Sequence, residues 1–262
     1  MDMKLKGRVA VIGGSSKGLG KGCAVSLAKE GADIVLCSND KSSLDETKAA
    51  IEGFGVTALP LMVDMSLKKD NERIIDETLK KFGKIDILVN NSGGPSSGTF
   101  FDFADEDWAK AFNDVLLYVI RLCRLAIPEM KKNKWGRIIN LTSLVVKEPA
   151  DTLILSNVFR TGVVSMAKTI SKDLIKDNIT INNICPGAFM TDRATELIAA
   201  AAKKNNTTSQ EIIAGAVKTM PLGRYQTPEE LGDLVAFLCS ENARGITGTT
   251  VQIDGGIFKG LM

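Results

Sequence analysis

The chain contains no histidine among its 262 residues. This absence excludes histidine-based catalytic triads, histidine general bases and histidine metal ligands. The five cysteines are widely spaced and none belongs to a C-x-x-C pair, so the sequence offers neither a zinc-binding pattern nor a disulfide framework. We therefore expect no metal site, and we expect the cysteines to be buried thiols of a protein in a reducing compartment.

Strong charge of either sign is also missing, because 33 basic residues nearly balance 31 acidic ones. A net charge of +2 gives no basic footprint for nucleic acid or for an anionic membrane surface. No apolar run is long enough to span a bilayer, and the N-terminus lacks the form of a signal peptide. We expect a cytoplasmic protein that acts on a small molecule, with no nucleic-acid or membrane partner.

Short β-branched runs alternate with amphipathic helical patterns along the whole chain. Strands are predicted at residues 9–12, 34–36, 59–63, 85–89, 137–141, 179–184 and 249–253. Helices are predicted at residues 18–29, 44–54, 71–82, 106–113, 115–130, 155–175, 196–203, 210–219 and 228–238. Near-continuous apolar strands between such helices indicate an α/β fold, with one doubly wound, Rossmann-type parallel sheet covered by helices on both faces.

We expect a single domain over residues 1–262, since no linker or internal repeat interrupts the alternation. The least regular stretch is residues 190–221. It follows a predicted strand end, where such folds place ligand-covering segments, and we expect it to form a substrate lid.

A glycine-rich loop, Gly13-Gly14-Ser15-Ser16-Lys17-Gly18-Leu19-Gly20, follows the first strand and opens the first helix. Glycine lets the backbone turn sharply and approach a ligand closely, and a helix N-terminus presents free N–H groups to an anion. The loop therefore predicts a binding site for the pyrophosphate of a dinucleotide.

The spacing G-x-x-x-G-x-G resembles that of the short-chain dehydrogenase/reductase family, and further motifs agree over nearly the whole chain. Asn90-Asn91-Ser92-Gly93 is similar to the family's N-N-A-G, and Asn182 to Gly187 resembles its N-x-x-x-P-G turn. Asp254-Gly255-Gly256 closes the chain as in that family. Gly13 departs from it, because threonine is usual there.

The resemblance implies an oxidoreductase with a pyridine dinucleotide and a set of cofactor contacts. These residues are Gly14, Ser16, Lys17, Gly18, Leu19, Gly20, Asn39, Asp64, Met65, Asn91, Ser92, Gly93, Arg160, Pro186, Gly187, Ala188 and Thr191. The second strand ends in Cys37-Ser38-Asn39 instead of the acid that binds a ribose 2′-OH. Lys17 is placed to reach a 2′-phosphate, so we expect NADP, with NAD as the second choice.

The family's catalytic centre is altered here. Its serine is present as Ser143, but Ser156 stands at the position of its tyrosine, Arg160 at that of its lysine and Val115 at that of its asparagine. Asn113, two residues from Val115, lies roughly 200° around a helix and should face elsewhere. Tyr118 is expected to pack between helices.

Reduction of a carbonyl creates an alkoxide, which needs a proton or strong hydrogen-bond donors. A serine hydroxyl is a much weaker acid than a phenol, and arginine does not release its proton near neutral pH. Ser156 and Arg160 lie four residues apart on one helix face. With Ser143 they form the candidate catalytic residues, a cationic, donor-rich site suited to a carbonyl, carboxylate or phosphate oxygen. Two interpretations remain open for the charged residues Lys147, Glu148 and Asp151. Desolvation shifts their pKa values toward neutrality at the site, or they are exposed loop charges.

The blocks Lys147-Glu148-Pro149 and Leu155-Ser156-Asn157 are similar to an atypical, β-ketoacyl-acyl-carrier-protein-reductase-like branch of that family. Two functions remain open: an oxidoreductase acting on a small carbonyl or alcohol, 3-oxoacyl reductase-like, or a non-catalytic dinucleotide-binding protein. The resemblance also implies a homo-oligomer, a tetramer or dimer, associated through the helices near 115–130 and 155–175. Leu116, Leu117, Val119, Val163, Val164 and Met166 belong either to that face or to the core.

Overall fold

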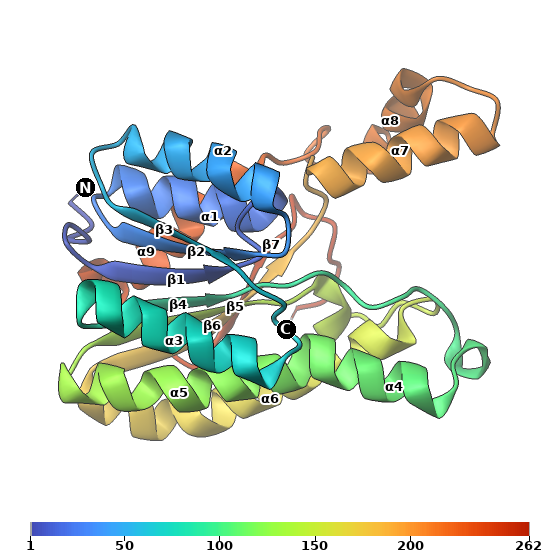
Figure 1. Ribbon diagram of the computed structural model, residues 1–262. Helices are drawn as coiled ribbons and strands as arrows, with labels where there is room; N and C mark the ends of the chain where they lie inside the picture. Colours follow the sequence, from blue (N-terminus) through green and yellow to red (C-terminus); the bar gives the residue numbers. More distant parts are fainter. Residues whose placement is uncertain (1, 262) are drawn as a thin grey trace.

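Seven parallel strands form the centre of the computed structural model, which describes residues 2–261 (Figure 1). The strands are β1 (Val9–Gly13), β2 (Asp33–Ser38), β3 (Ala58–Met62), β4 (Ile87–Asn90), β5 (Gly136–Leu141), β6 (Ile179–Pro186) and β7 (Thr250–Ile253). Their order in the sheet is β3-β2-β1-β4-β5-β6-β7. The chain reverses its winding direction between β1 and β4, which confirms the predicted doubly wound α/β fold.

Helices cover both faces of this sheet. On one face lie α1 (Gly18–Lys29), α2 (Lys41–Glu52) and α9 (Pro228–Cys239), and on the other α3 (Lys68–Phe82), α5 (Tyr118–Lys132) and α6 (Ile154–Leu174). Alternate residues of β1 enter the two cores, as Ala10 and Ile12 do on one side and Val9 and Val11 on the other. Val119 and Val163, considered above for an association face, are buried in the second core.

The two helices predicted at 106–113 and 115–130 are joined without a break, contrary to expectation. A π-helical segment, Phe112–Leu117, links α4 (Asp105–Ala111) to α5. Val115 is buried there. Asn113 points away, because its amide nitrogen donates to the Ala109 carbonyl at 3.3 Å and its amide oxygen lies 3.5 Å from Arg121. As predicted, it does not replace the missing asparagine.

Residues 190–221 form an arm of two helices, α7 (Asp192–Lys204) and α8 (Ser209–Val217), which projects beyond the carboxyl ends of the strands (Figure 1). Each helix begins at a threonine whose hydroxyl accepts a backbone N–H, Thr191 from Ala194 and Thr208 from Glu211. We call α7 and α8 the arm.

The remaining elements are short 3-10 turns, and the other predicted boundaries shift by a few residues. The turns are Phe100–Asp102, Leu144–Val146, Ile175–Asp177 and Glu241–Ala243. Within residues 2–261, none of the helices combines the length and apolar character needed to cross a bilayer.

Candidate active site

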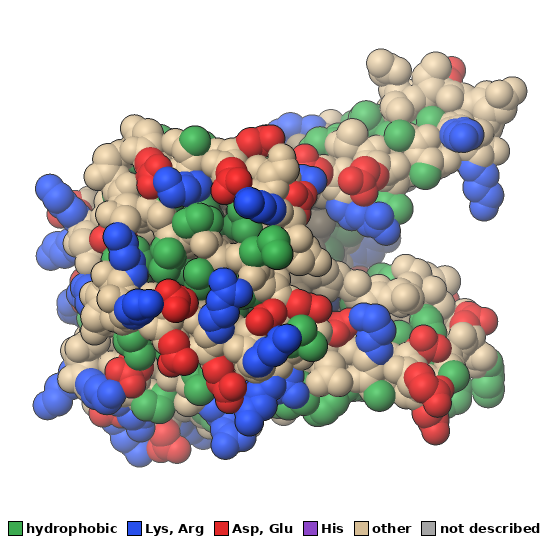
Figure 2. All heavy atoms as spheres, in the orientation of Figure 1, with side chains coloured by type: hydrophobic (Ala, Val, Ile, Leu, Met, Phe, Trp, Pro, Cys, Tyr) green, Lys and Arg blue, Asp and Glu red, His purple; other side chains and the backbone are tan. Residues whose placement is uncertain are grey.

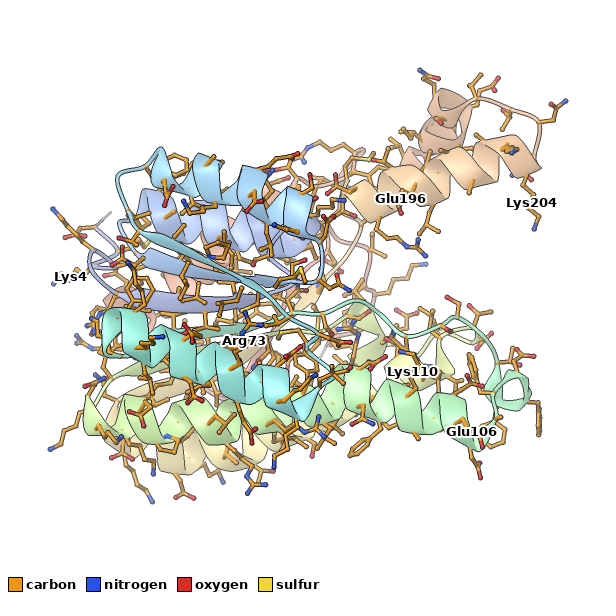
Figure 3. All side chains as sticks on the ribbon, viewed as in Figure 1. Lys4, Arg73, Glu106, Lys110, Glu196 and Lys204 are labelled. Atoms are coloured by element: carbon orange, nitrogen blue, oxygen red, sulfur yellow. The ribbon has the colours of Figure 1, made fainter. Side chains whose placement is uncertain are left out.

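A cleft opens at the carboxyl ends of the strands, between the arm and the body of the molecule (Figure 2). It contains two adjoining cavities of about 310 and 360 Å³, which share Gly14 and the loop 92–94. Figure 3 labels Glu196 on α7 and Lys110 on α4, which stand on opposite sides of this cleft. The position is the point where the strand order reverses, where such sheets bind ligands.

The glycine loop is held in a shape that only glycine permits. Gly14 and Gly18 have φ angles of 55° and 52°, in the left-handed region. A Cβ on Gly14 would lie 2.7 Å from the amide nitrogen of Asn91, and one on Gly20 would lie 2.2 Å from the Gly14 carbonyl oxygen. Asn91 donates to the Gly13 and Gly14 carbonyls at 3.1 and 3.3 Å. The loop therefore fits the close approach of a pyrophosphate to backbone N–H groups.

Steric crowding also explains the glycine at position 13, where the resembled family usually has threonine. A Cβ there would lie 2.4 Å from the Asn91 carbonyl oxygen and 2.9 Å from the Met65 methyl group. Glycine in place of threonine at position 13 therefore fits the close packing of the neighbouring Asn91 and Met65.

Most of the predicted cofactor residues line these two cavities. They are Gly14, Lys17, Gly18, Leu19, Asn39, Asp64, Met65, Asn91, Ser92, Gly93 and Thr191. The others lie outside the cavity walls: Ser16, Gly20, Arg160, Pro186, Gly187 and Ala188. Ser16 is buried behind the loop, where its hydroxyl lies 2.7 Å from that of Ser38, and Gly187 packs against Asp254.

Several residues of the cavity walls were not predicted from the sequence. They are Ser38, Val63, Ser66, Gly94, Lys110, Asp114, Asp192, Arg193 and Glu196. Ser66 and Gly94 directly follow the predicted residues Met65 and Gly93, so extending each predicted segment by one residue would have included them. Lys110 and Asp114 arrive from α4 and the π-helical segment, for which no local motif exists.

Basic side chains around the cofactor half of the cleft are paired with acids. Lys17 lies 2.8 Å from Asp40, whose pKa falls to about 2 because Lys17 and Ser43 donate hydrogen bonds to it. Lys110 pairs with Asp114, and Arg193 lies 3.5 Å from Glu196. Asp64 and Asp192 also line these cavities, so acids outnumber bases in this part of the cleft.

The arm also contacts the glycine loop directly. The backbone N–H of Gly18 donates to the Asp192 carboxylate at 3.1 Å. This carboxylate therefore occupies a donor at the start of α1, the end of a helix that favours negative charge. A phosphate group approaching this N–H meets Asp192 as a competitor.

Ser156 and Arg160 come together on one face of α6, as predicted, behind the cleft wall formed by the loop 92–94. Arg160 Nε donates to the Ser156 hydroxyl at 3.2 Å. Its Nη1 donates to the carbonyls of Leu141 and Thr142, at 3.0 and 3.2 Å, so the guanidinium is bound to the carboxyl end of β5. Burial lowers the pKa of Arg160, but an arginine remains protonated at neutral pH.

Ser143 follows Thr142 directly and begins the 3-10 turn 144–146, where its hydroxyl accepts the N–H of Val145 at 3.4 Å. All three candidate catalytic residues thus stand at one end of β5, although no hydrogen bond joins Ser143 to the other two within the described chain.

Tyr118 packs in the core beneath the site, as expected, with 3% of its surface exposed. Burial raises the pKa of its phenol, while a hydrogen bond with Ser92 and the charge of Arg160 act in the opposite direction. A buried phenol with a raised pKa does not readily release its proton near neutral pH.

Together, this fold and cleft define a Rossmann-type dinucleotide-binding protein, and comparison with known proteins places it further. Residues 14–258 match the family described as Enoyl-(Acyl carrier protein) reductase. The chain is 31% identical over 265 residues to the uncharacterized oxidoreductase YvrD of Bacillus subtilis, covering 100% of both chains. It is 30% identical to the 3-oxoacyl-[acyl-carrier-protein] reductase FabG of Thermotoga maritima, covering 97% of this chain and 99% of that one.

The L-sorbose reductase of Gluconobacter frateurii, solved in complex with NADPH and L-sorbose, superimposes with a TM-score of 0.96. It shares 34% identity, and the match covers 100% of both chains. The chain belongs to the short-chain dehydrogenase/reductase family, in the FabG-like branch.

Proposed function

We propose that the protein is an oxidoreductase that transfers a hydride between NADP(H) and a small carbonyl or alcohol. The observation that carries the proposal is that Arg160, which is hydrogen-bonded to Ser156, lies next to the wall of the cofactor cleft. Its Nη2 is 3.9 Å from where a Cβ would stand on Gly94. A bound NADPH would supply the hydride for the carbonyl carbon, and a proton on the carbonyl oxygen would complete the alcohol, leaving the oxidised cofactor.

The residues at the end of β5 then hold the reacting oxygen. Ser143 and Ser156 provide hydroxyl donors, and Arg160 provides a fixed positive charge that stabilises a developing alkoxide. With serine at position 156, water or a residue of the loop 147–151 supplies the proton. The chain therefore replaces proton donation by a phenol with electrostatic stabilisation.

The test is oxidation of NADPH by the purified protein with a panel of small ketones, aldehydes and oxo acids. Wild-type turnover above that of Ser143→Ala is expected, and turnover equal to that control would refute catalysis at this site. The double substitution Ser156→Tyr with Arg160→Lys is expected to reduce this activity, because it removes the proposed oxygen site.

The alternative is a non-catalytic dinucleotide-binding protein, which the missing tyrosine favours. It predicts that the wild type binds NADPH without turnover of any panel member, and that only the double variant acquires activity. Calorimetric binding of NADPH, measured beside the activity assay, separates this alternative from a protein that does not bind the cofactor.

We also propose NADP over NAD, supported by Lys17 at the cleft wall and by the lack of an acid at Cys37-Ser38-Asn39. Asp40 opposes this preference through its ion pair with Lys17. Dissociation constants of NADPH and NADH for the wild type and Lys17→Ala test it. Lysine removal is expected to weaken NADPH binding selectively.

The arm is proposed to act as the substrate lid, supported by its place at the cleft and by the contact between Asp192 and Gly18.

Self-association of the chain into a dimer or tetramer is proposed as well. Phe100 and Phe101 are strongly exposed, and Val164 lines the outer face of α6. Sedimentation of the purified chain tests for a dimer or tetramer. The five unpaired, buried cysteines support a reducing compartment such as the cytoplasm.

A further inference from the structure

The positive charges that line the cleft are neutralised differently from those at the carboxyl end of β5, the site of Ser143, Ser156 and Arg160, which we call the reaction end. Lys17, Lys110 and Arg193, in the cofactor half, each lie within 4.0 Å of a carboxylate. Arg160 and Lys147, at the reaction end, form no ion pair with any of residues 2–261. This contrast points to a ligand that brings its own negative charge to the reaction end.

Arg160 is held in one orientation with a donor group to spare. Its Nε and Nη1 are engaged by Ser156 and by the carbonyls of Leu141 and Thr142. Its Nη2 donates to no other residue of the described chain. This nitrogen lies 3.9 Å from where a Cβ would stand on Gly94, a glycine that lines both cavities of the cleft. The guanidinium therefore presents one free amino group toward the loop that borders the cleft.

The neighbours of Arg160 do not compensate its charge. The ionisable groups that act on it are Tyr118 and Cys185, and burial raises the pKa of each, so both are neutral near pH 7. A partly desolvated cation without a counter-charge is costly, unless a bound anion supplies one. A carboxylate on a guanidinium is the strong, charge-assisted form of such a contact.

Lys147 adds a second positive charge at the same end of β5. Its ammonium lies 5.6 Å from the ring centre of Phe258, and it acts on the thiol of Cys185 through space. Glu148 and Asp151, which follow it along the chain, are exposed and pair with neither cation. The reaction end thus has two cations without a neutralising acid.

We propose that the substrate is a carboxylic acid with its reacting carbonyl or hydroxyl a short distance from the carboxylate, that is, an oxo acid or the corresponding hydroxy acid. Its carboxylate binds Arg160 Nη2 with electrostatic support from Lys147, while Ser143 receives the reacting oxygen. In the reducing direction the oxo acid takes a hydride at carbon and a proton at oxygen, and the reduced dinucleotide becomes oxidised. This inference rests on the proposed function and names its substrate class.

The competing role for Nη2 is a hydrogen bond to a hydroxyl group of the cofactor. That role requires no negative charge on the substrate. It predicts that loss of Arg160 weakens cofactor binding and leaves discrimination between acids and neutral analogues unchanged. The two roles are therefore separable by binding measurements.

The experiment titrates the NADPH-loaded protein with 2-, 3- and 4-hydroxybutyrate and with their amides, by calorimetry. At least one acid is expected to bind about tenfold or more tightly than its amide, since a charge-assisted bond is replaced by a neutral one. Equal binding of acids and amides across the series, or the absence of binding by any acid, would overturn the proposal without use of a variant.

Three variants locate the effect. Arg160→Gln is expected to reduce the acid-to-amide ratio to near one, and Lys147→Gln to reduce it by a smaller factor. Arg244→Gln removes an exposed arginine from the end of the molecule's last 3-10 turn and is expected to leave the ratio unchanged. An Arg160→Gln protein that loses NADPH affinity but keeps the ratio would assign Nη2 to the cofactor and refute the proposal.

Turnover measurements distinguish failure of the proposed substrate class from failure of the proposed oxidoreductase function. Oxidation of NADPH by neutral ketones with no preference for oxo acids refutes the substrate class alone. An absence of oxidation by neutral and acidic carbonyls alike refutes the proposed activity, while the binding titrations still decide whether the site selects a carboxylate.

Discussion

Lys17 and Asp40 oppose each other beside the glycine loop, and their pairing bears directly on which dinucleotide is preferred. The lysine is the cation proposed to meet a 2′-phosphate, yet its ammonium already lies 2.8 Å from the Asp40 carboxylate. The pKa of Lys17 is raised by this partner, so the lysine is fully charged at neutral pH. The Asp40 carboxylate therefore competes with a 2′-phosphate for the Lys17 ammonium.

We predict that Asp40→Asn strengthens NADPH binding by roughly threefold and leaves NADH binding nearly unchanged, because it frees Lys17 from an exposed ion pair. Asparagine also caps α2 in place of aspartate, so the helix is retained. Calorimetric dissociation constants provide the measurement. Asp45→Asn, an exposed change on the same helix, is the control for net charge, and an equal gain there would exclude the proposed pairing effect.

At the scale of elements, the glycine loop is held in place by the contact of α1 with α9. Gly22 and Gly232 allow the two helices to meet closely, since a Cβ on Gly22 would lie 2.3 Å from the Pro228 carbonyl oxygen. Ser26 on α1 donates to Asp233 on α9 at 2.9 Å. The helix that presents the loop is thus positioned by a segment some 200 residues further along the chain.

We predict that Gly22→Ala lowers the free energy of unfolding by about 1–3 kcal/mol, because the added methyl group overpacks the helix contact. Gly215→Ala is the matched control, since this glycine of α8 has open space around its Cβ position. That change is expected to be neutral or stabilising through higher helix propensity. Urea unfolding of both variants provides the comparison, and equal destabilisation would contradict the overpacking account.

The N-terminus of α9 makes a second contribution to the free energy of unfolding, and this one depends on pH. Glu230 accepts two hydrogen bonds from Arg224, each 2.8 Å, and the N–H of Thr227 at 2.7 Å. These donors lower the pKa of Glu230 from 4.5 to about 2. Because the folded-state pKa is depressed, the stabilisation is fully present above the unfolded pKa and is lost as the pH falls through about 2.

We predict that Glu230→Gln lowers the Tm by about 1–3 °C near pH 7, a small effect because the ion pair lies at the surface, with Glu230 partly exposed and Arg224 exposed. The difference from wild type should shrink as the pH falls from about 5 to about 2. Glu229→Gln, on the same turn without a described partner, is the control. A Tm difference for Glu230→Gln that is independent of pH would show that ionisation is not involved.

At the scale of the whole molecule, the five cysteines are distributed through the cores and none is paired. Burial raises the pKa of Cys37, Cys123 and Cys239 to about 12, so their thiolates are scarce at neutral pH. We predict that Ellman's reagent labels fewer than one thiol per folded chain and all five in denaturant. Rapid labelling of several thiols under native conditions would show that these cores open readily.

Several features of the fold and site followed from local sequence. The doubly wound sheet followed from apolar strands between amphipathic helices, and the glycine loop from its place after β1. Ser143, Ser156 and Arg160 were chosen from the family resemblance. Their four-residue spacing predicted that Ser156 and Arg160 share a helix face, and the structure brings the two into contact. The continuous helix through 112–117 was not foreseen, because a π-helical turn leaves the hydrophobic pattern nearly unchanged.

By itself the sequence determined the class of fold and the position of the glycine loop, because these depend on residue type and short-range spacing. Only the tertiary structure decided which charges are neutralised. Lys17 meets Asp40 and Gly18 meets Asp192, whereas Arg160 is left with a free donor above the end of β5. Such pairings join side chains from elements distant in the chain, and packing of the whole sheet sets their distances.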